Sequence, residues 1–553
     1  MAGLKAYVGA PITAKHLGLP ENVANTKAQA QLRQRLDIKT VRGAEVVDTR
    51  SQYFNLRLEG EAYLAHLQRF EAPLNASLGV WFFTKGSTRF HAAYEDPKLL
   101  TGDEKGSRAW VRWIFERTAA MQKKLNLNIS LQAHYPNEIG PHNVAEWVKG
   151  MEETGIGIDS MVPSEFAWEE YQYGSLTNPN KEKRELARTV QRETFQMAKL
   201  LGVPVVNHWL GIDGYEIPFG QNHSWAYSMI AGATAEAMKE TPGQQATFEP
   251  KPYEPRAFNY VASTQEGMML ARMIEAELVK TSGLNRDLLE EGITMVGLTP
   301  EIGHMQMAYE VLARSFELAL MEGRLFGIHW NGQPLGSYDI DENPGTFNYE
   351  TMLEVAYVLL RGGFAGVNCL DINPLRMPLE DAVQIGFLNL STVIAKARKL
   401  PHRGIAFAIS NPEAGGNAAI QYLLLSQREK DTFQGQYARD QFNRIVGTES
   451  SEDKHEGDRP ATAAPMTEIE IADKVIQVIN HLHDALVMQE IPITPKMRLV
   501  EDLGMTSHDK VEFGGALKEA FKIKIWDREI LKCETLEDAI KLVLAKLSEK
   551  RVI

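Results

Sequence analysis

Eight short apolar runs, each followed by a stretch with helical periodicity, restrict the fold of this sequence more than any other feature. The intervening stretches, such as KEKRELARTVQRETFQMAKLLG, place apolar residues three and four positions apart and so predict amphipathic helices. Strands that alternate with helices pair in parallel, and eight such units close into a (β/α)8 TIM barrel. An open doubly wound sheet is the alternative, but no GxGxxG motif follows the first run. The runs are LGVWFFTKG (78–86), NISLQAHYP (128–136), GIGIDSMVP (155–163), VPVVNHWLG (203–211), QATFEPKP (245–252), ITMVGLTPE (293–301), LFGIHWNG (325–332) and GVNCLDIN (366–373).

A stretch that is poor in large apolar side chains separates two parts of the chain. Residues 447–465, GTESSEDKHEGDRPATAAP, mix charges with Ala, Thr and Pro and cannot bury enough surface to offset the entropy of ordering. We therefore expect a flexible linker there. Before it we expect an N-terminal extension over residues 1–75 and a barrel with a C-terminal helical extension over 76–446. After it we expect a separate small domain over 466–553.

Charge and composition argue against several classes of protein. A formal net charge of −13 is unfavourable for a general nucleic-acid binder, because a phosphate backbone requires a basic surface. The two cysteines, Cys369 and Cys533, fall in different predicted domains and cannot form a disulfide framework. No segment reaches the roughly 20 apolar residues of a membrane-spanning helix. We therefore expect a cytoplasmic protein that binds neither nucleic acid nor membrane.

Polar side chains stand at the ends of the apolar runs, and the chemistry of a barrel takes place at the carboxyl ends of its strands. Acidic and imidazole groups that converge on one rim repel or compete unless a cation lies between them. Oxygen and nitrogen donors without thiolates suit a hard or borderline divalent ion such as Mn, Mg or Co. The sequence therefore predicts a metal site. The candidates are His134, Trp209, Glu249, Lys251, Glu301, His304, His329 and Asp371, with Asp339 and Asp341 in the loop after the seventh run.

Each candidate alone also has a plainer interpretation. A single histidine at a strand end is usually a satisfied polar residue rather than a ligand. Asp339 and Asp341 lie in a loop rich in Gly and Pro, where aspartates usually form turns. Lys251 stands between two prolines, where a solvated surface charge is the ordinary interpretation. The coincidence of these residues at the ends of several different strands favours the metal site.

Several of these motifs resemble the xylose isomerase superfamily over about residues 75–400. They are FEPKPYEPR (248–256), TPEIGHMQMA (299–308), LFGIHWNGQ (325–333), YDID (338–341) and GVNCLDINPLR (366–376). Within the superfamily, the sequence is most similar to the L-rhamnose isomerase branch, because His329 stands where the xylose isomerase branch usually has Asp. The resemblance implies a metal-dependent enzyme that interconverts aldoses and ketoses.

The resemblance also implies a role for each matching residue. One metal ion would be held by Glu249, Glu301, His329 and Asp371, and a second by Glu301, His304, Asp339 and Asp341. Lys251 would contact the carbonyl oxygen of the substrate, and His134 would assist ring opening. The expected catalytic residues are therefore Lys251, His134 and the metal ligand Asp371. Trp209 and Trp330 would form the apolar wall of the sugar pocket.

Two positions depart from the family pattern. The second run continues as AHYPNE, with Asn137 where some members place an acid that orients the histidine. Glu301 stands where rhamnose-type enzymes usually carry Asp. Three other functions stay open: an epimerase, which inverts one carbon without moving the carbonyl; a metal phosphoesterase, which an acidic chain suits poorly; and an inactive barrel that serves as a scaffold.

The C-terminal part contains LVEDLGMTSHDKVEF, in which Ser507 begins a predicted helix. Alone, Ser507 would be interpreted as a helix N-cap. The surrounding pattern, with a later FKIKI segment and TLEDA, resembles an acyl carrier protein, which is a small all-α four-helix domain. That resemblance implies that Ser507 carries 4′-phosphopantetheine, whose phosphodiester would lie at the positive end of a helix dipole.

The two resemblances together imply a set of partners. A sugar or polyol would be the substrate, a phosphopantetheinyl transferase would modify the carrier, and an acyl-loading enzyme would charge it. The substrate would be either free or bound to the carrier arm, within a biosynthetic pathway. Relatives of such barrels are commonly tetramers, so we expect a homotetramer.

Overall fold

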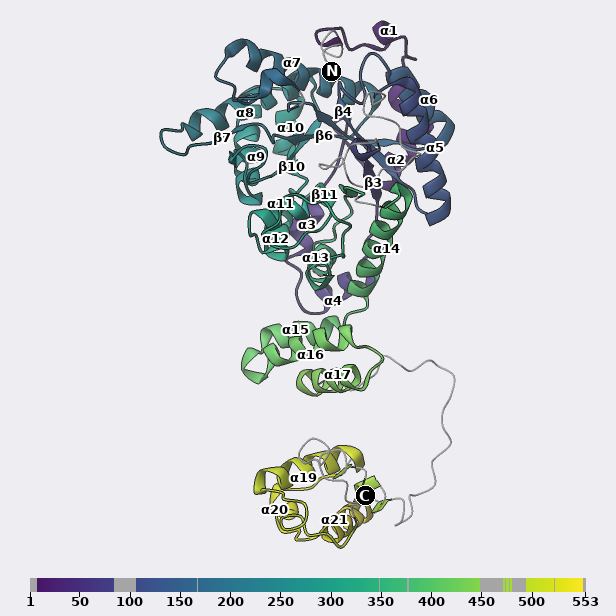
Figure 1. Ribbon diagram of the computed structural model, residues 1–553, viewed down its shortest axis with the longest axis vertical. Helices are drawn as coiled ribbons and strands as arrows, with labels where there is room; N and C mark the ends of the chain where they lie inside the picture. The colour runs from purple at the N-terminus through teal and green to yellow at the C-terminus, as the bar shows by residue number, and fades with distance from the viewer. Residues whose placement is uncertain are drawn as a thin grey trace. The chain divides into compact units, whose positions relative to one another are not determined.

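The computed structural model describes residues 7–83, 106–447, 471–479 and 494–550, without positions 167, 348, 375, 376, 473, 477 and 522. The chain divides into two compact units, Met1–Glu449 and Ser450–Ile553. Figure 1 shows the course of the chain. The predicted linker lies, apart from Gly447, outside the described residues.

An eight-stranded parallel sheet forms the centre of the first unit, as the alternating runs predict. The strand order is β10-β8-β6-β5-β4-β3-β12-β11, which is the order along the chain taken around a circle. Parallel bridges from Leu298 to Leu325 and from Glu301 to His329 join the two end strands and close the barrel. The strands are β3 (Ala76–Gly79), β4 (Ser130–Tyr135), β5 (Ile158–Pro163), β6 (Val205–Trp209), β8 (Gln245–Glu249), β10 (Val296–Leu298), β11 (Gly327–Trp330) and β12 (Val367–Leu370).

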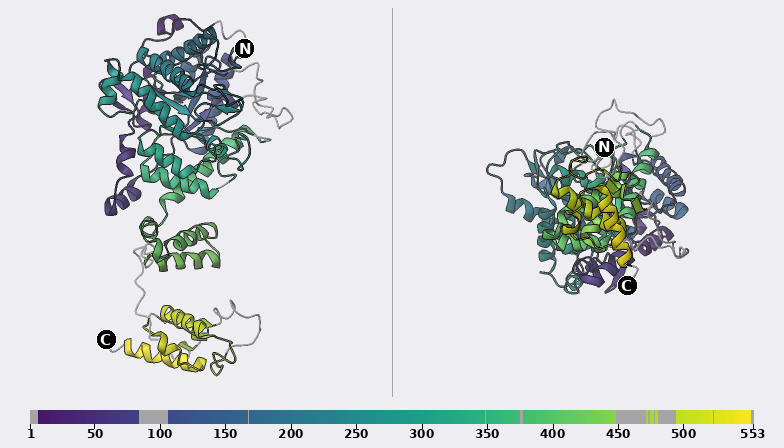
Figure 2. Two further views of the ribbon diagram at one scale, coloured as in Figure 1. Left: turned by 90° about the vertical axis from the view of Figure 1, so that its left-hand side faces the viewer. Right: turned by 90° about the horizontal axis from the view of Figure 1, so that it is seen from below.

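Helices cover the outside of the barrel, as Figure 2 shows from two further sides. Helix α7 illustrates how the sequence defines them: the Asn180 side chain caps its first turn, and Gly202 ends it in the left-handed conformation with φ 68°. One face of α7 carries buried residues such as Phe195 and Leu201, which pack toward the sheet. The covering helices are α5 (Arg108–Leu125), α6 (Val144–Thr154), α7 (Lys181–Leu201), α8 (His223–Glu240), α9 (Thr264–Leu278), α10 (Leu284–Glu290), α11 (Ile302–Met307), α12 (Leu312–Met321), α13 (Tyr349–Gly362) and α14 (Leu379–Arg398).

The N-terminal segment lies at the amino ends of the barrel strands. The Gln29 amide donates to the carbonyl of Ile158 at the start of β5. Gln245, which begins β8, donates to the carbonyl of Val47, and Gln52 donates to Leu325 just before β11. This segment therefore covers the end of the barrel opposite the carboxyl ends of the strands. It contains α1 (Ala14–Leu17), α2 (Lys27–Arg35), the hairpin β1 (Lys39–Val41) and β2 (Ala44–Val46), α3 (Arg50–Asn55) and α4 (Gly60–Arg69).

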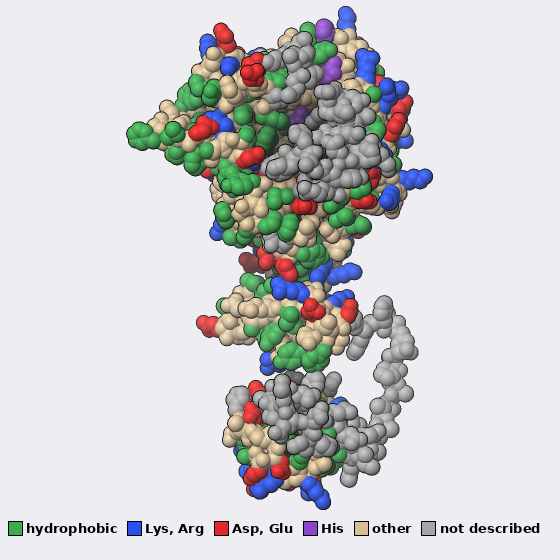
Figure 3. Space-filling view, in the orientation of Figure 1, with side chains coloured by type: hydrophobic (Ala, Val, Ile, Leu, Met, Phe, Trp, Pro, Cys, Tyr) green, Lys and Arg blue, Asp and Glu red, His purple; other side chains and the backbone are tan. Residues whose placement is uncertain are grey.

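Two additions extend the first unit. A short antiparallel pair, β7 (Gly214–Tyr215) with β9 (Phe258–Asn259), projects from the carboxyl-end side of the barrel. Hydrophobic side chains gather on this projection in Figure 3. In the loop after β7, Ile217 is 67% and Phe219 94% exposed. After α14, three helices follow that pack on one another: α15 (His402–Ser410), α16 (Gly416–Arg428) and α17 (Phe433–Val446).

The second unit has its own core. Its described helices are α19 (Ser507–Phe521), α20 (Asp527–Ile530) and α21 (Leu536–Lys550). Phe513, Leu517, Leu536 and Val543 are buried in one cluster with apolar residues of the helical segment 471–479. Residues 480–493, which follow that segment, lie outside the described residues. Among the helices that are described, none has both the length and the apolar character needed to cross a bilayer.

Candidate metal centre

A cavity of about 300 Å³ opens at the carboxyl ends of the barrel strands and brings the predicted residues together. Because the strands are parallel and closed into a ring, polar residues far apart in the chain end at one rim. Trp209 and Glu249 end β6 and β8, Asp371 directly follows β12, and Glu301 lies after β10 at the start of α11. The predicted residues that line the cavity are His134, Trp209, Glu249, Lys251, Glu301, His304, His329, Asp339, Asp341 and Asp371.

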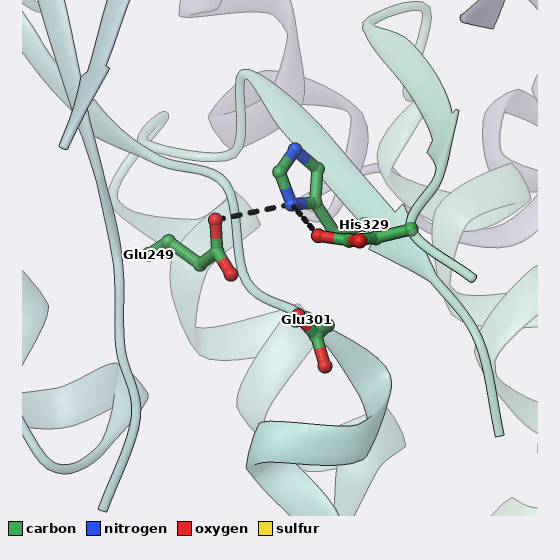
Figure 4. Close-up of side chains that lie close together, drawn as sticks. Glu249, Glu301 and His329 are labelled. Carbon is green, nitrogen blue, oxygen red and sulfur yellow. Dashed lines mark ion pairs between the residues drawn. The ribbon is translucent and has the colours of Figure 1, made fainter. Parts of the chain in front are cut away.

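Two groups of side chains in this cavity have their ligand atoms within 4.8 Å of one another. One consists of Glu249, Glu301, His329 and Asp371, and the other of Glu301, His304 and Asp339, so Glu301 belongs to both. Figure 4 shows Glu249, Glu301 and His329 pointing toward one another. Asp341 lines the same cavity but is not part of the second group.

The imidazoles in both groups face carboxylate oxygens. His329 Nδ1 lies 3.0 Å from Glu249 Oε2 and 3.3 Å from Asp371 Oδ2. His304 Nδ1 lies 3.3 Å from Glu249 Oε1, and its Nε2 lies 3.0 Å from Asp339 Oδ1. Both Nδ1 atoms are buried and make no well-formed hydrogen bond among the described residues. Nitrogen lone pairs and carboxylate oxygens that converge in this way fit ligands around a shared cation.

The electrostatics of the cluster lead to the same conclusion. Burial and the negative charges of Asp339, Asp341, Asp371 and Glu249 raise the pKa of Glu301 well above its usual value. Burial alone would lower the pKa of His329, but Glu249 and Asp371 raise it to about 10. Protein charges alone therefore leave the crowded carboxylates poorly compensated. A divalent ion would supply the missing positive charge, so the donor set fits a metal centre.

Neighbouring side chains orient the carboxylates. The Trp81 indole donates to Asp371 Oδ1 at 2.7 Å, and the Asn331 amide donates to Glu301 Oε1 at 2.7 Å. The Asn207 amide lies 3.3 Å from Glu249 Oε2. Sequence reasoning missed all three residues. Trp81 lay inside a run interpreted only as apolar strand, and the two asparagines carry no charge that would mark them as ligands.

His134 has an acidic partner, but not at the position that the family pattern suggests. His134 Nδ1 lies 2.9 Å from Glu138 Oε2, and the backbone N–H of His134 donates to the same oxygen. The turn after β4 thus brings the carboxylate of Glu138 back onto the strand end, while Asn137 lines the cavity wall. Glu138 therefore supplies the acidic partner of His134 that is absent at position 137.

Lys251 is buried, which contradicts its interpretation as a solvated surface charge. Its side chain is 3% exposed, and its Nζ donates to Asp339 Oδ2 and Glu254 Oε2, each at 2.6 Å. Burial opposes the charged form, but Asp339 and Glu254 more than compensate and raise the pKa of Lys251. The ammonium also lies 5.1 Å from the centre of the Trp209 ring. A permanently charged donor thus faces the cavity beside the second ligand group.

The aromatic wall differs in part from the prediction. Trp209 lines the cavity, with Phe166 packed edge-on at 4.6 Å between ring centres. Trp330 is not among the described residues that line it. Side chains alternate along a strand, so His329 points into the barrel and Trp330 points away, where its indole donates to Asn368. The second tryptophan of the wall is Trp81, which packs against His134 at 4.8 Å.

Comparisons with known proteins agree with this geometry. The family model described as xylose isomerase-like TIM barrel matches residues 126–384. The xylose isomerase of Thermus thermophilus is 27% identical over 244 residues, which are 43% of this chain and 59% of the relative. The xylose isomerase of Streptomyces lividans is 33% identical over 136 residues, 25% of this chain and 30% of the relative. This chain thus spans less than two thirds of these relatives.

A solved structure titled as that of L-ribulose 3-epimerase aligns with a TM-score of 0.39 and 13% identity, over 59% of this chain and 95% of that one. This similarity is too weak to indicate a function. The family model and the curated relatives, together with the closed parallel sheet, support a xylose isomerase-like TIM barrel in the first unit of this chain.

Proposed function

We propose that the barrel is a metal-dependent sugar isomerase that interconverts an aldose and a ketose. The observation that carries the proposal is the pair of ligand groups that share Glu301 within one cavity. That cavity also contains the buried cation of Lys251 and the His134–Glu138 pair. His329 in the first group favours a relative of the L-rhamnose type within the superfamily.

The first ion would be held by Glu249, Glu301, His329 and Asp371, and the second by Glu301, His304 and Asp339, with Asp341 close by. Mn, Mg and Co suit these oxygen and imidazole ligands. Bound divalent ions polarise neighbouring sugar oxygens as Lewis acids.

The chain's own residues perform the remaining tasks. Lys251 presents its ammonium to the cavity and stabilises negative charge that grows on a substrate oxygen. His134 transfers a proton between the ring oxygen and the anomeric hydroxyl when a cyclic sugar opens, and Glu138 fixes the orientation of its imidazole. Trp209, Phe166 and Trp81 give the cavity an apolar wall that keeps water from the reacting carbons.

Removal of metal tests this function directly. Protein dialysed against EDTA should lose ketose formation from a panel of pentoses, hexoses and 6-deoxyhexoses, and addition of Mn²⁺ or Co²⁺ should restore it. NMR of the product distinguishes the possible reactions. A shifted carbonyl supports the isomerase, and inversion of one carbon without a shift assigns an epimerase. Metal binding without any turnover of the panel would favour the scaffold over the isomerase.

Replacing Glu138 with Gln tests the role of His134. The variant should turn over cyclic aldoses about 10–100-fold more slowly, because the imidazole loses the carboxylate that orients it. A three-carbon aldose cannot close a ring, so its turnover should change little. An equal loss with both kinds of aldose, measured as kcat/KM, would exclude a role confined to ring opening.

We also propose that the second unit is an acyl carrier domain modified on Ser507. Thr506, rather than Ser507, caps α19: its hydroxyl accepts from the N–H of Asp509, and the Asp509 carboxylate accepts from the N–H of Thr506. Ser507 is exposed in the first turn of the helix, and capping does not occupy its hydroxyl. A phosphodiester there would face the positive helix end.

The carrier proposal implies a phosphopantetheinyl transferase and an enzyme that loads the arm. A short flexible tether raises the local concentration of a bound group to about the millimolar range, which would favour transfer to or from a nearby site. A biosynthetic role in the cytoplasm and assembly as a homotetramer stay predictions. The His508 side chain, which replaces the leucine common in carriers, lies outside the described residues.

A further inference from the structure

A line of buried hydrogen bonds connects the candidate metal centre with the interior of the barrel. His329 Nε2 lies 2.9 Å from Gln132 Oε1, and Gln132 Nε2 donates to Asp159 Oδ1 at 3.0 Å. The Ser77 hydroxyl donates to Asp159 Oδ2 at 2.6 Å. Strands β12 and β3 lie between β11 and β4 in the sheet, so the bond between His329 and Gln132 crosses the barrel interior.

The surroundings of this line are closed to water. Gln132 and Asp159 are each 2% exposed, and Ser77 and His329 at most 1%. Buried polar groups of this kind must satisfy one another, so each donor and acceptor is determined by its neighbour. Burial raises the pKa of the Asp159 carboxyl, while Ser130, Ser77 and Gln132, through hydrogen bonds, and the charge of Arg35 oppose that rise.

The chemistry of Asp159 determines the direction of every bond in the line. Asp159 Oδ1 accepts from the NH₂ group of Gln132, and Oδ2 accepts from the Ser77 hydroxyl, so both carboxyl oxygens act as acceptors. The carbonyl oxygen of Gln132 then faces His329, and it too can only accept. His329 must therefore carry a proton on Nε2, so that in the neutral imidazole, the form that binds a metal ion, the lone pair is on Nδ1. Nδ1 is the atom that faces Glu249, as Figure 4 shows, and it also faces Asp371.

We infer that Gln132, held by Asp159, is a positioning residue that sets the tautomer and the ring orientation of His329 for metal binding. The inference rests on the proposed function, because it gives the buried line a purpose only if Nδ1 binds a metal ion. Partners of a metal-binding imidazole typically contribute about 10–100-fold to metal affinity.

The test replaces Gln132 with Met, which keeps the length of the side chain and removes the acceptor. The metal-free full chain is titrated with Co²⁺, and binding is followed by calorimetry and by the visible absorption of the bound ion. In Gln132→Met, one of two Co²⁺ ions should bind about 10–100-fold more weakly than in the wild type. The ion held by the His304 group should keep its affinity, because among the described residues Gln132 bonds to Asp159 and His329 and not to His304, Glu301 or Asp339.

Gln191→Met is the matched control. Gln191 is fully buried and donates to the Thr234 hydroxyl at 3.0 Å, between α7 and α8. It should lower the melting temperature by an amount similar to Gln132→Met while leaving both Co²⁺ affinities unchanged. This separates a loss of positioning from a general loss of stability.

Each outcome decides between the two proposals. If the wild type binds no Co²⁺, the proposed metal centre fails and the inference fails with it. If the wild type binds two ions and Gln132→Met binds both equally well, only the inference is overturned. Should Gln132→Met not fold, Asp159→Asn decides, because an amide both donates and accepts and no longer determines how Gln132 is turned. Asp159→Asn should bind one of the two Co²⁺ ions several-fold more weakly, and an unchanged affinity would overturn the inference.

Discussion

Glutamine in place of Glu301 is expected to abolish isomerase activity and the binding of both metal ions. Glu301 is the one residue common to the two ligand groups, so a neutral amide there removes a ligand from each. We expect the rate of ketose formation to fall about a thousand-fold or more, which corresponds to about 4 kcal/mol of transition-state stabilisation. Calorimetric titration with Mn²⁺ and a ketose assay measure the two losses.

The fold should survive this substitution. Glutamine keeps an oxygen for the Asn331 amide and resembles the neutral carboxyl that the raised pKa of Glu301 favours, so the metal-free variant should melt no earlier than the metal-free wild type. Glu275→Gln is the matched control, because Glu275 accepts hydrogen bonds from Arg324 and from backbone N–H groups away from the cavity. Substantial ketose formation by Glu301→Gln would refute the shared-ligand arrangement.

Alanine in place of Ser507 is expected to prevent modification of the second unit completely. The wild type, produced in cells with a phosphopantetheinyl transferase, should gain the mass of one phosphopantetheine group or of that group with its cargo. Ser507→Ala should show only the mass of the unmodified chain, because alanine has no hydroxyl to which the phosphopantetheine arm could be attached. Intact-mass spectrometry gives the answer, and any additional mass on the wild type identifies what the arm carries.

Two further variants separate attachment from helix stability. Ser548→Ala removes an exposed hydroxyl on α21 that bonds to the carbonyl of Leu544 and should leave the modification unchanged. Thr506→Ala removes the cap of α19 and should destabilise the second unit by about 1 kcal/mol while Ser507 can still be modified. A wild-type chain that gains no mass in such cells would contradict the carrier proposal.

The barrel could be predicted because its strands are largely buried and therefore lie in short runs rich in apolar residues. The eight runs correspond to the eight strands of the sheet. The first strand was placed too late: β3 ends at Gly79, and Val80–Phe82 form a 3-10 turn. Apolar content does not distinguish a buried turn from the strand before it, so the aromatic residues of that turn were assigned to the strand.

The residues that line the candidate metal centre could be predicted because charged residues at strand ends are visible in the sequence, whereas their orientation is not. Trp330 follows the candidate ligand His329 but points to the opposite side of the strand, and Trp81 lines the cavity instead. Glu138 and Gln132 orient histidines through a turn and across the barrel. Such contacts depend on the closed sheet and have no signature in local sequence.

Residues 27–55 close the base of the barrel, the end at which the amino ends of the strands lie, and this has a consequence for how the chain folds. Their partners lie far along the chain: Gln29 bonds to Ile158, and Gln52 bonds to Leu325, which is 273 residues later. During synthesis the early segment leaves the ribosome long before the seventh strand of the barrel exists. These amides therefore remain hydrated until the residues that carry their acceptors have been synthesised. The base is thus closed by contacts of long sequence separation, the kind that slow folding.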